Sequence, residues 1–374
     1  MKRWAVLTGE YPPMAGGVSD YTRAVAEGLA AAGDSVTVFA PPGAESREEN
    51  GVMIRSLPDH FGPRSLRALD RALSRGPRPD FILIQYVPHA FGWKAMNLPF
   101  AFWVSLRARR HGPVWVMFHE VLFPFAWRPS SHAVLGVVSR LMARLIAGAA
   151  DRTFVSIPAW GSLLSQILPS MNPPTWLPVP CVVASDATPE AVATVRRSFP
   201  SDAVVIGHFG TFGSYITAVL GPTISLLLSR RPSAHVLLIG RNAERLFVAL
   251  ATEDTLSERV HVAGELPADE IGAYLRACDV LLLPYPDGIS SRRGTAMAGL
   301  AHGVPIVSNA GALSEALWST SQAVRLAAGF DATSMADAVE ALLDDPERER
   351  TGERGKALYA ASFDVERIIH MLRS

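Results

Sequence analysis

A chain of 374 residues is longer than one ordinary domain and fits two of roughly 150 residues each. Hydrophobic residues make up 49% of it and charged residues 19%, a composition that excludes a disordered chain. The formal net charge is zero, so no nucleic-acid partner is expected. The two cysteines, Cys181 and Cys278, have no metal-ligand or CxxC spacing, which predicts a reduced, cytoplasmic protein without structural zinc.

No segment is predicted to cross a membrane. The richest apolar stretch, 134–150, is interrupted by Arg140 and Arg144 and predicts an amphipathic helix. The apolar run near the N-terminus, 4–7, is too short for the core of a signal peptide and predicts a first strand.

The first half of the chain predicts strands alternating with helices, which indicates a parallel sheet covered on both faces. A helix is expected where Val18, Tyr21, Val25 and Leu29 recur at helical spacing, ending at Gly33. The predicted strands are residues 4–8, 36–39, 81–84, 114–118 and 152–155.

A proline-rich segment, 169–200, separates this series from a second one of the same kind. We therefore expect an α/β protein of two Rossmann-like doubly wound domains, 1–185 and 186–360, followed by a C-terminal helix, 361–374, whose packing partner the sequence does not give. The second series contains strands 203–208, 235–239, 260–262, 280–283 and 305–307, and helices 271–277 and 295–302.

Two segments of the first domain carry candidate chemistry. Gly16 and Gly17 lie where the first strand leads into a helix, so their backbone could approach an anionic ligand, although a plain tight turn explains them equally. His119 and Glu120 follow strand 114–118, and ligands of open α/β sheets bind beyond the carboxyl ends of strands. His119 could donate a hydrogen bond to a hydroxyl or shuttle a proton; the alternative is a structural histidine.

Two segments of the second domain suit a phosphate ligand. The loop 207–214 supplies glycines with Thr211, and it lacks the lysine of an ATPase loop. The loop after strand 280–283 ends at a helix N-terminus, where the helix dipole and guanidinium groups favour a diphosphate, the alternative being a solvated basic loop. Its candidate donor-binding residues are Asp287, Ser290, Ser291, Arg292, Arg293, Gly294 and Thr295.

These segments give the chain a resemblance to family 4 glycosyltransferases of the GT-B fold over almost its whole length. The N-terminal part of the resemblance is Glu10-Tyr11-Pro12-Pro13 with Gly16-Gly17-Val18. The C-terminal part is more specific: Gly264, Pro267, Tyr274, Asp279-Val280 and Pro284, then 303–307 (GVPIV) and 363–367 (FDVER).

The resemblance implies two facing domains with the active site between them, the first holding the acceptor and the second a nucleotide-diphosphate sugar. It implies transfer with retention of anomeric configuration, with no metal and no cofactor. Gly16 and Gly17 would approach the sugar and phosphates, His119 would lie beside the sugar, and Val262, Gly264 and Leu266 would border the base. The catalytic candidates are His119, Gly17 and Asp20, and Gly210, Thr211 and Arg241 join the donor-binding set.

The sequence departs from the family pattern at two places. Ser290 and Ala298 stand where the family commonly has Glu-x7-Glu, and the Gly210 loop lacks the usual arginine and lysine. Other cations must then meet the diphosphate, and we expect one of Arg292 and Arg293 to do so while its neighbour packs or faces solvent. The donor sugar does not follow from the resemblance.

The predicted function is glycosyl transfer, of hexosyl type, to a glycan, lipid-linked or small-molecule acceptor. An epimerase or phosphorylase on the same fold and a non-catalytic sugar-nucleotide-binding protein are the alternatives. Aromatic and basic residues cluster in the first domain, which suits peripheral contact with the inner membrane surface or, alternatively, buried aromatics with snorkelling arginines. These clusters are Trp103 with Arg107, Arg109 and Arg110, and Phe123, Phe125 and Trp127 with Arg128.

Overall fold

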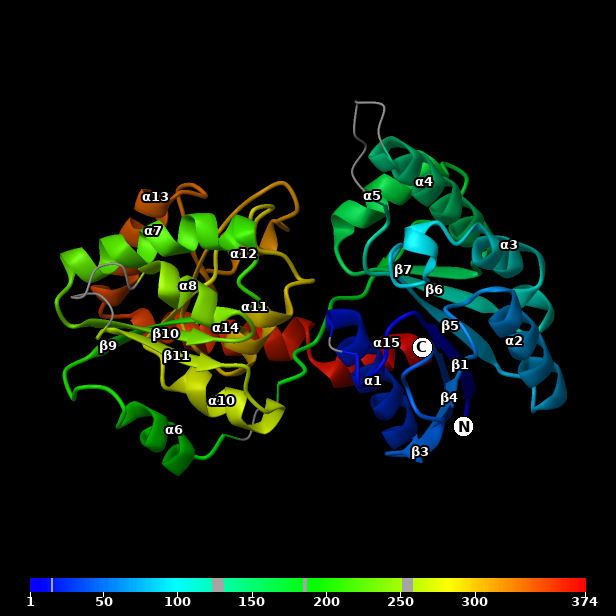
Figure 1. The fold of residues 1–374 in the computed structure, drawn as a ribbon, viewed down its shortest axis with the longest axis horizontal. Helices are drawn as coiled ribbons and strands as arrows, with labels where there is room; N and C mark the ends of the chain where they lie inside the picture. The colour runs from blue at the N-terminus through cyan, green and yellow to red at the C-terminus, as the bar shows by residue number, and fades with distance from the viewer. Residues whose placement is uncertain (15, 123–130, 184–186, 251–257) are drawn as a thin grey trace. The chain divides into compact units, whose positions relative to one another are not determined.

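The computed structural model describes residues 1–14, 16–122, 131–183, 187–250 and 258–374 (Figure 1). Its contacts divide the chain into two compact units, Met1–Val179 with Val365–Ser374, and Pro180–Asp364. The sequence predicts a boundary at 185/186 and a separate C-terminal helix, 361–374. In the structure the last helix is part of the first unit, and the packing described below is the reason.

The first unit is built on an eight-stranded sheet of order β3-β4-β2-β1-β5-β6-β7-β8, parallel except between β3 and β4. The five strands predicted for this half of the chain are confirmed within one or two residues. The strands are β1 Arg3–Thr8, β2 Ser35–Ala40, β3 Arg47–Glu49, β4 Val52–Ser56, β5 Phe81–Tyr86, β6 Val114–Phe118, β7 Arg152–Val155 and β8 Thr175–Trp176.

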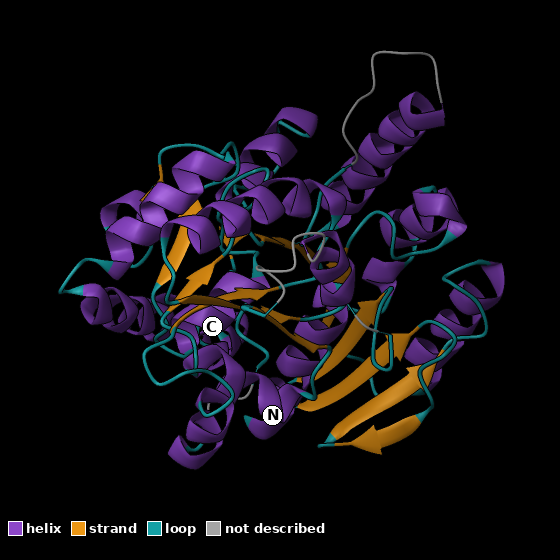
Figure 2. Ribbon diagram, turned by 60° about the vertical axis from the view of Figure 1, so that its left-hand side comes forward, coloured by secondary structure: helices purple, strands orange, loops and turns teal. Residues whose placement is uncertain are grey.

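Helices cover both faces of this sheet (Figure 2). One core forms under α2, α3, α4 and α5, and the other under α1 and the C-terminal α15. Gly28 of α1 allows α15 to approach, because a Cβ there would lie 2.8 Å from Cγ1 of Ile369. The helices are α1 Gly17–Ala31, α2 Pro63–Arg75, α3 Leu98–Leu106, α4 Ser131–Ala149, α5 Pro158–Ile167 and α15 Val365–Arg373.

The second unit has a six-stranded, fully parallel sheet of order β11-β10-β9-β12-β13-β14. Its main core lies between the sheet and α7, α8 and α13. The strands are β9 Val204–Phe209, β10 Ala234–Ile239, β11 Val260–Gly264, β12 Val280–Leu282, β13 Ile306–Asn309 and β14 Arg325–Ala327. The helices are α6 Pro189–Arg196, α7 Ser214–Arg230, α8 Ala243–Leu250, α10 Ala268–Arg276, α11 Gly294–Ala301, α12 Leu317–Thr320, α13 Ala332–Leu343 and α14 Arg348–Ser362.

Both sheets follow the Rossmann strand order 3-2-1-4-5-6 once the short edge strands β3 and β8 of the first sheet are set aside. The direction of winding reverses between β1 and β5 in the first unit and between β9 and β12 in the second. Ligands of such sheets bind at the carboxyl ends of the strands beside this reversal. The topology therefore directs attention to the loops after β1, β5 and β6, and to those after β9 and β12.

Among the described helices, none combines the length and the apolar character that crossing a bilayer requires.

Candidate functional site

In the first unit, the loop after β1 brings Gly16 and Gly17 to the start of α1. Gly17 is exposed, and a Cβ on it would meet nothing within 4 Å. A Cβ on Gly16 would instead lie 2.8 Å from Oε2 of Glu10. The first turn of α1 therefore presents its N–H groups beside open space, an arrangement that favours an anion.

The backbone of His119 is held firmly at the carboxyl end of β6. Its N–H donates to the carbonyl of Tyr86 at 3.0 Å, which extends the pairing of β5 with β6. Its carbonyl accepts from Oγ of Ser156 at 3.0 Å and from Nε1 of Trp160 at 2.8 Å. The backbone of His119 is thus fixed by β5, by the turn after β7 and by α5.

The His119 ring is buried, and its contacts fix its orientation. Nε2 lies 2.9 Å from Oε1 of Gln85, and the edge of the ring meets Tyr21 of α1 with centroids 4.6 Å apart. Burial lowers the pKa of His119 to about 3, so the imidazole is neutral near pH 7. A neutral ring with this pKa is suited to a hydrogen bond and unsuited to shuttling protons. Through Tyr21, the structure brings His119 and the first turns of α1 together.

Asp20, the third catalytic candidate, lies in the first turn of α1 and is half-buried. Its carboxylate is 3.7 Å from Arg23, and burial raises its pKa. Its backbone N–H donates to the carbonyl of Gly16. The described contacts thus tie Asp20 to its own helix, and none of them joins it to His119.

Glu10 and His89 contact each other at the same edge, and this contact was not predicted from the sequence. Oε1 of Glu10 is 3.4 Å from Nε2 of His89, and this contact raises the pKa of His89. Glu10 follows β1 and His89 follows β5, the two strands at the reversal of winding. Their position after predicted strands was the signal that could have identified them.

In the second unit, three glycines let the loops after β9, β10 and β11 approach one another closely. The N–H of Gly240 donates to the carbonyl of Gly264 at 2.6 Å. The N–H of Gly210 donates to the carbonyl of Ile239 at 3.0 Å. Gly240 has φ of +121°, and a side chain there would collide with the carbonyl oxygen of Gly210. Gly210 and Gly264 thus belong to one assembly, with backbone rather than side chains at its surface.

The other predicted residues of this assembly are partly or fully exposed. Nε of Arg241 lies 3.5 Å from Oε1 of Glu265, and Thr211, after β9, is exposed. Val262 and Leu266, expected beside the base, are partly exposed at the end of β11. These residues share the carboxyl edge of the sheet with the loop after β12.

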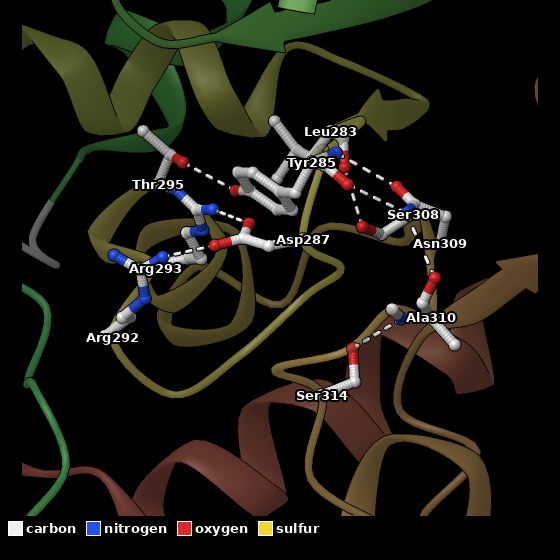
Figure 3. Close-up of polar contacts among 11 residues, drawn as sticks. Leu283, Tyr285, Asp287, Arg292, Arg293, Thr295, Ser308, Asn309, Ala310 and Ser314 are labelled. Carbon is white, nitrogen blue, oxygen red and sulfur yellow. Dashed lines mark hydrogen bonds and ion pairs between the residues drawn. The ribbon is translucent and has the colours of Figure 1, made fainter. Parts of the chain in front are cut away.

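Arg292 and Arg293, immediately before α11, both pair with the carboxylate of Asp287 (Figure 3). The guanidinium of Arg293 also lies over the ring of Tyr285, 4.7 Å from its centroid. Tyr285 in turn bonds through its hydroxyl to Oγ1 of Thr295 at 2.6 Å. Asp287, both arginines and Thr295 are therefore brought together at the N-terminus of α11.

The sequence predicts that Arg292 and Arg293 turn in different directions, so that only one meets the diphosphate, but in this structure both turn toward the carboxylate of Asp287. Neighbouring side chains point apart in a regular strand, but Arg293 lies at the N-cap of α11 with φ −85° and ψ 92°, after a turn in which its N–H donates to Ser290. This irregular backbone lets both guanidinium groups reach one carboxylate. Which of them meets a ligand stays a prediction.

Asn309, at the end of β13, holds the loop after β12 in place. Its Oδ1 accepts from the N–H of Tyr285 at 2.9 Å, and its Nδ2 donates to the carbonyl of Tyr285 at 2.8 Å. Gly288, at φ +84°, packs so closely on Gly311 that a side chain would collide with its backbone. The arginine cluster therefore rests on a supported loop.

Glu315 anchors the middle of this loop, and the sequence reasoning did not identify it. Its carboxylate accepts from the N–H of Ser291 at 3.0 Å and from Nε1 of Trp318 at 2.6 Å. Ser291, a candidate for donor binding, thus makes a hydrogen bond within the protein. Ser290 is fully buried, and its Oγ has no hydrogen-bond partner in the described part of the chain. Gly294, the first residue of α11, is exposed with nothing within 4 Å of a Cβ.

His208 links the two central strands below the Gly210 loop. Its Nδ1 lies 2.7 Å from the carbonyl of Leu282, which can only accept, so Nδ1 carries the proton. Its ring meets Phe212 edge-on, and burial lowers its pKa to about 4. His208 and His119 are both neutral, buried histidines.

Acidification is expected to lower the free energy of unfolding, because the folded pKa values of His119 and His208, about 3 and about 4, lie below the value of 6.5 for an unperturbed histidine. Between these values the unfolded chain binds more protons, so stability present above pH 6.5 is lost as the pH falls. Urea unfolding at several pH values measures this loss. His208→Asn, whose amide can still donate to Leu282, should lose less; an equal loss would contradict the assignment.

In the aromatic and basic cluster around Trp103, the tryptophan is buried and the arginines are exposed. Trp103 is buried and donates to Asp70 at 3.0 Å, and Arg107 pairs with the same carboxylate at 2.9 Å. Arg109 pairs with Asp151. Of the two readings, buried aromatics with snorkelling arginines fits this cluster, and membrane contact through Trp103 is wrong. The second cluster, 123–128, lies outside the described residues.

Two family models match the chain. A glycosyl transferase 4-like domain matches residues 16–181, and glycosyl transferases group 1 matches residues 203–345. The first match begins at Gly16 and contains His119, and the second contains the Gly210 and Arg292 loops.

Known relatives resemble the chain over nearly its full length. A D-inositol 3-phosphate glycosyltransferase from Arthrobacter sp. (strain FB24) is 26% identical in an alignment 416 positions long, which covers 98% of this chain and 93% of the relative. Sucrose-phosphate synthase from Thermosynechococcus elongatus has TM-score 0.74 and 19% identity, covering 100% of this chain and 98% of that one. HepE of Anabaena in complex with UDP-glucose has TM-score 0.70 and 15% identity, with 100% and 98% covered.

Proposed function

Since this chain is a glycosyltransferase that belongs to the family 4-like group of the GT-B fold, we propose that it moves a sugar from a nucleotide-diphosphate donor to a hydroxyl acceptor. The observation that carries the donor half of the proposal is the convergence of Arg292 and Arg293 at the N-terminus of α11. Two guanidinium groups lie there beside the helix N–H groups, and both kinds of donor suit a diphosphate.

The reaction we propose retains the anomeric configuration and uses no metal. The bond between the anomeric carbon and the diphosphate oxygen breaks, and a bond forms from that carbon to the acceptor oxygen, whose proton passes to the departing diphosphate. Negative charge grows on the leaving group, and preorganised arginine and N–H donors stabilise it. In this scheme the guanidinium groups supply the positive charge that a metal supplies in other transferases.

The experiment is a panel of UDP-, GDP-, TDP- and ADP-sugars, assayed for release of nucleotide diphosphate with and without hydroxyl acceptors. Acceptor-dependent release, with the sugar recovered on the acceptor, is the expected result. Isomerisation of the sugar nucleotide without acceptor would identify an epimerase, and dependence on inorganic phosphate a phosphorylase. Binding without any turnover would identify a non-catalytic binding protein. UDP-sugars come first, because a fold neighbour was solved with UDP-glucose.

A peripheral membrane contact, which would suit a lipid-linked acceptor, is the second part of the proposal. Val134, Val137 and Leu141 share one side of α4 and are 58%, 58% and 41% exposed. On α3, which packs against α4, Phe102 and Leu106 are 46% and 69% exposed. Neither helix contains an acidic residue, and α4 carries two arginines, so this α3–α4 surface suits an anionic bilayer.

Val137→Asp is expected to weaken binding to vesicles that contain anionic lipid about ten- to hundredfold, since burial of one aliphatic side chain contributes about 1.5–3 kcal/mol. Co-sedimentation with phosphatidylcholine vesicles with and without phosphatidylglycerol measures it. Val248→Asp is the matched control, because Val248 is 69% exposed on α8 in the other unit. Equal binding by both variants, or no binding by the wild type, would remove the membrane contact.

A further inference from the structure

Gln85 has no part in the function proposed above, yet it makes the hydrogen bond that reaches the His119 ring. It is fully buried near the end of β5, and its Oε1 is 2.9 Å from Nε2 of His119. A carboxamide oxygen can only accept a hydrogen bond, so the proton of the neutral imidazole is on Nε2. The other ring nitrogen, Nδ1, therefore carries a lone pair.

The amide of Gln85 is costly to bury in this arrangement. Its Nε2 is buried and, within the described ranges, has no hydrogen-bond partner. An apolar residue of similar size would avoid that cost, so stability alone does not explain a glutamine here. The hydrogen bond that it offers to His119 is the contribution that remains.

The surroundings of His119 leave Nδ1 available. No described residue hydrogen-bonds Nδ1, and His119 is 6% exposed, at the carboxyl end of β6. The ring is held by the edge contact with Tyr21, and its backbone is fixed by the carbonyl of Tyr86 and the side chains of Ser156 and Trp160. With ring and backbone fixed, the site of the proton decides whether Nδ1 donates or accepts.

We propose that Gln85 is a positioning residue that holds His119 in the tautomer protonated on Nε2, so that Nδ1 accepts a hydrogen bond from a hydroxyl of the donor sugar. A hydroxyl that donates to Nδ1 becomes more electron-rich, which favours the positive character that the sugar gains as its bond to the diphosphate breaks. The role of the sugar rests on the proposed function, whereas the tautomer is a property of the protein without ligand.

The tautomer is measured directly by long-range ¹H–¹⁵N NMR of the histidine rings in the full-length protein without ligand, with His119 assigned by comparison with His119→Gln. The expected result is one neutral form with the proton on Nε2. Gln85→Met, which keeps the size but offers no acceptor oxygen, should let the form protonated on Nδ1 appear. A proton on Nδ1 in the wild type, or an unchanged tautomer in Gln85→Met, would overturn the proposal whether or not the protein transfers sugar.

Steady-state kinetics test the second part of the proposal, the hydrogen bond between His119 and the donor sugar. Gln85→Met should lower kcat about tenfold with little change in the KM for donor, because the hydrogen bond strengthens in the transition state. Tyr86→Phe is the matched control: Tyr86 is the next residue of β5, on the opposite face, and its buried hydroxyl has no hydrogen-bond partner among the described residues. It should change neither the tautomer nor kcat. Equal kcat for Gln85→Met and the wild type would remove Gln85 from the reaction.

Gln85→Glu gives a signature that a purely structural role would not produce. A carboxylate beside Nε2 favours the imidazolium, in which both nitrogens are donors and Nδ1 can no longer accept. The other contacts of His119, from β5, α1, α5 and the turn after β7, carry no charge near neutral pH, and Glu120 is the adjacent acidic residue. The activity of Gln85→Glu should therefore fall at acid pH and recover as the pH rises. The wild type should not show this acidic fall in activity. A folded Gln85→Glu variant whose activity does not fall at acid pH would contradict the proposal.

Discussion

Replacing Arg293 or Arg292 with alanine is expected to weaken binding of the nucleotide-diphosphate sugar about ten- to hundredfold, because loss of a charged hydrogen-bond partner costs about 1.5–3 kcal/mol. Arg293 should give the larger effect. It lies at the N-cap of α11 and over the Tyr285 ring, so its guanidinium is held in place before the ligand arrives. Donor titration by calorimetry and donor-dependent kinetics measure each variant separately.

Arg230→Ala is the matched control for these two variants. Arg230 is also paired with carboxylates in the second unit, Asp337 and Glu340, but it lies at the end of α7, away from the strand ends that the topology marks as the site. It should leave donor binding unchanged. If neither Arg292→Ala nor Arg293→Ala changes affinity or rate by more than about twofold, the phosphate site lies elsewhere.

His119→Ala is expected to lower kcat roughly a hundredfold while changing the affinity for donor far less, because its hydrogen bond strengthens as the sugar approaches the transition state. With a pKa of about 3, His119 should also leave no ionisation in the wild-type rate profile near neutral pH. Single-turnover kinetics and a donor titration separate the two quantities.

The control for His119 is His111, a partly buried histidine of the first unit. His111 lies 3.0 Å from Asp70, in the cluster that contains Trp103, and His111→Asn should leave turnover unchanged. Circular dichroism and thermal unfolding establish that both variants fold. Unchanged kcat in a folded His119→Ala protein would make His119 a structural residue.

Much of the fold could be predicted because its strands are buried on both faces. The segment 114–118 is a continuous apolar run, and all five of its residues are buried. The strands Arg47–Glu49 and Val52–Ser56 could not be predicted in this way, since one is short and polar and the other is mostly exposed. The packing of α15 on α1 joins residues more than 300 positions apart, which no local pattern records.

The location of the candidate site could be predicted from the sequence, but the contacts between its side chains could not. Sequence placed His119 and Arg292 in loops after strands, and the strand order puts those loops at the carboxyl edges of the sheets. The contact between His119 and Gln85 spans 34 residues and depends on the register of β5 with β6. The meeting of both arginines at Asp287 depends on loop backbone angles that residue spacing does not specify.

In the proposed function, the carboxyl edge of the second sheet binds a nucleotide-diphosphate sugar through Arg292 and Arg293. Thermal unfolding of the wild type and of the Arg292→Ala, Arg293→Ala double variant, each with UDP-, GDP-, TDP- and ADP-sugars, tests it most directly. A bound donor raises the Tm by mass action. At least one donor is expected to stabilise the wild type, and the same donor should no longer stabilise the double variant. Equal stabilisation of both proteins, or of neither by any donor, would contradict it.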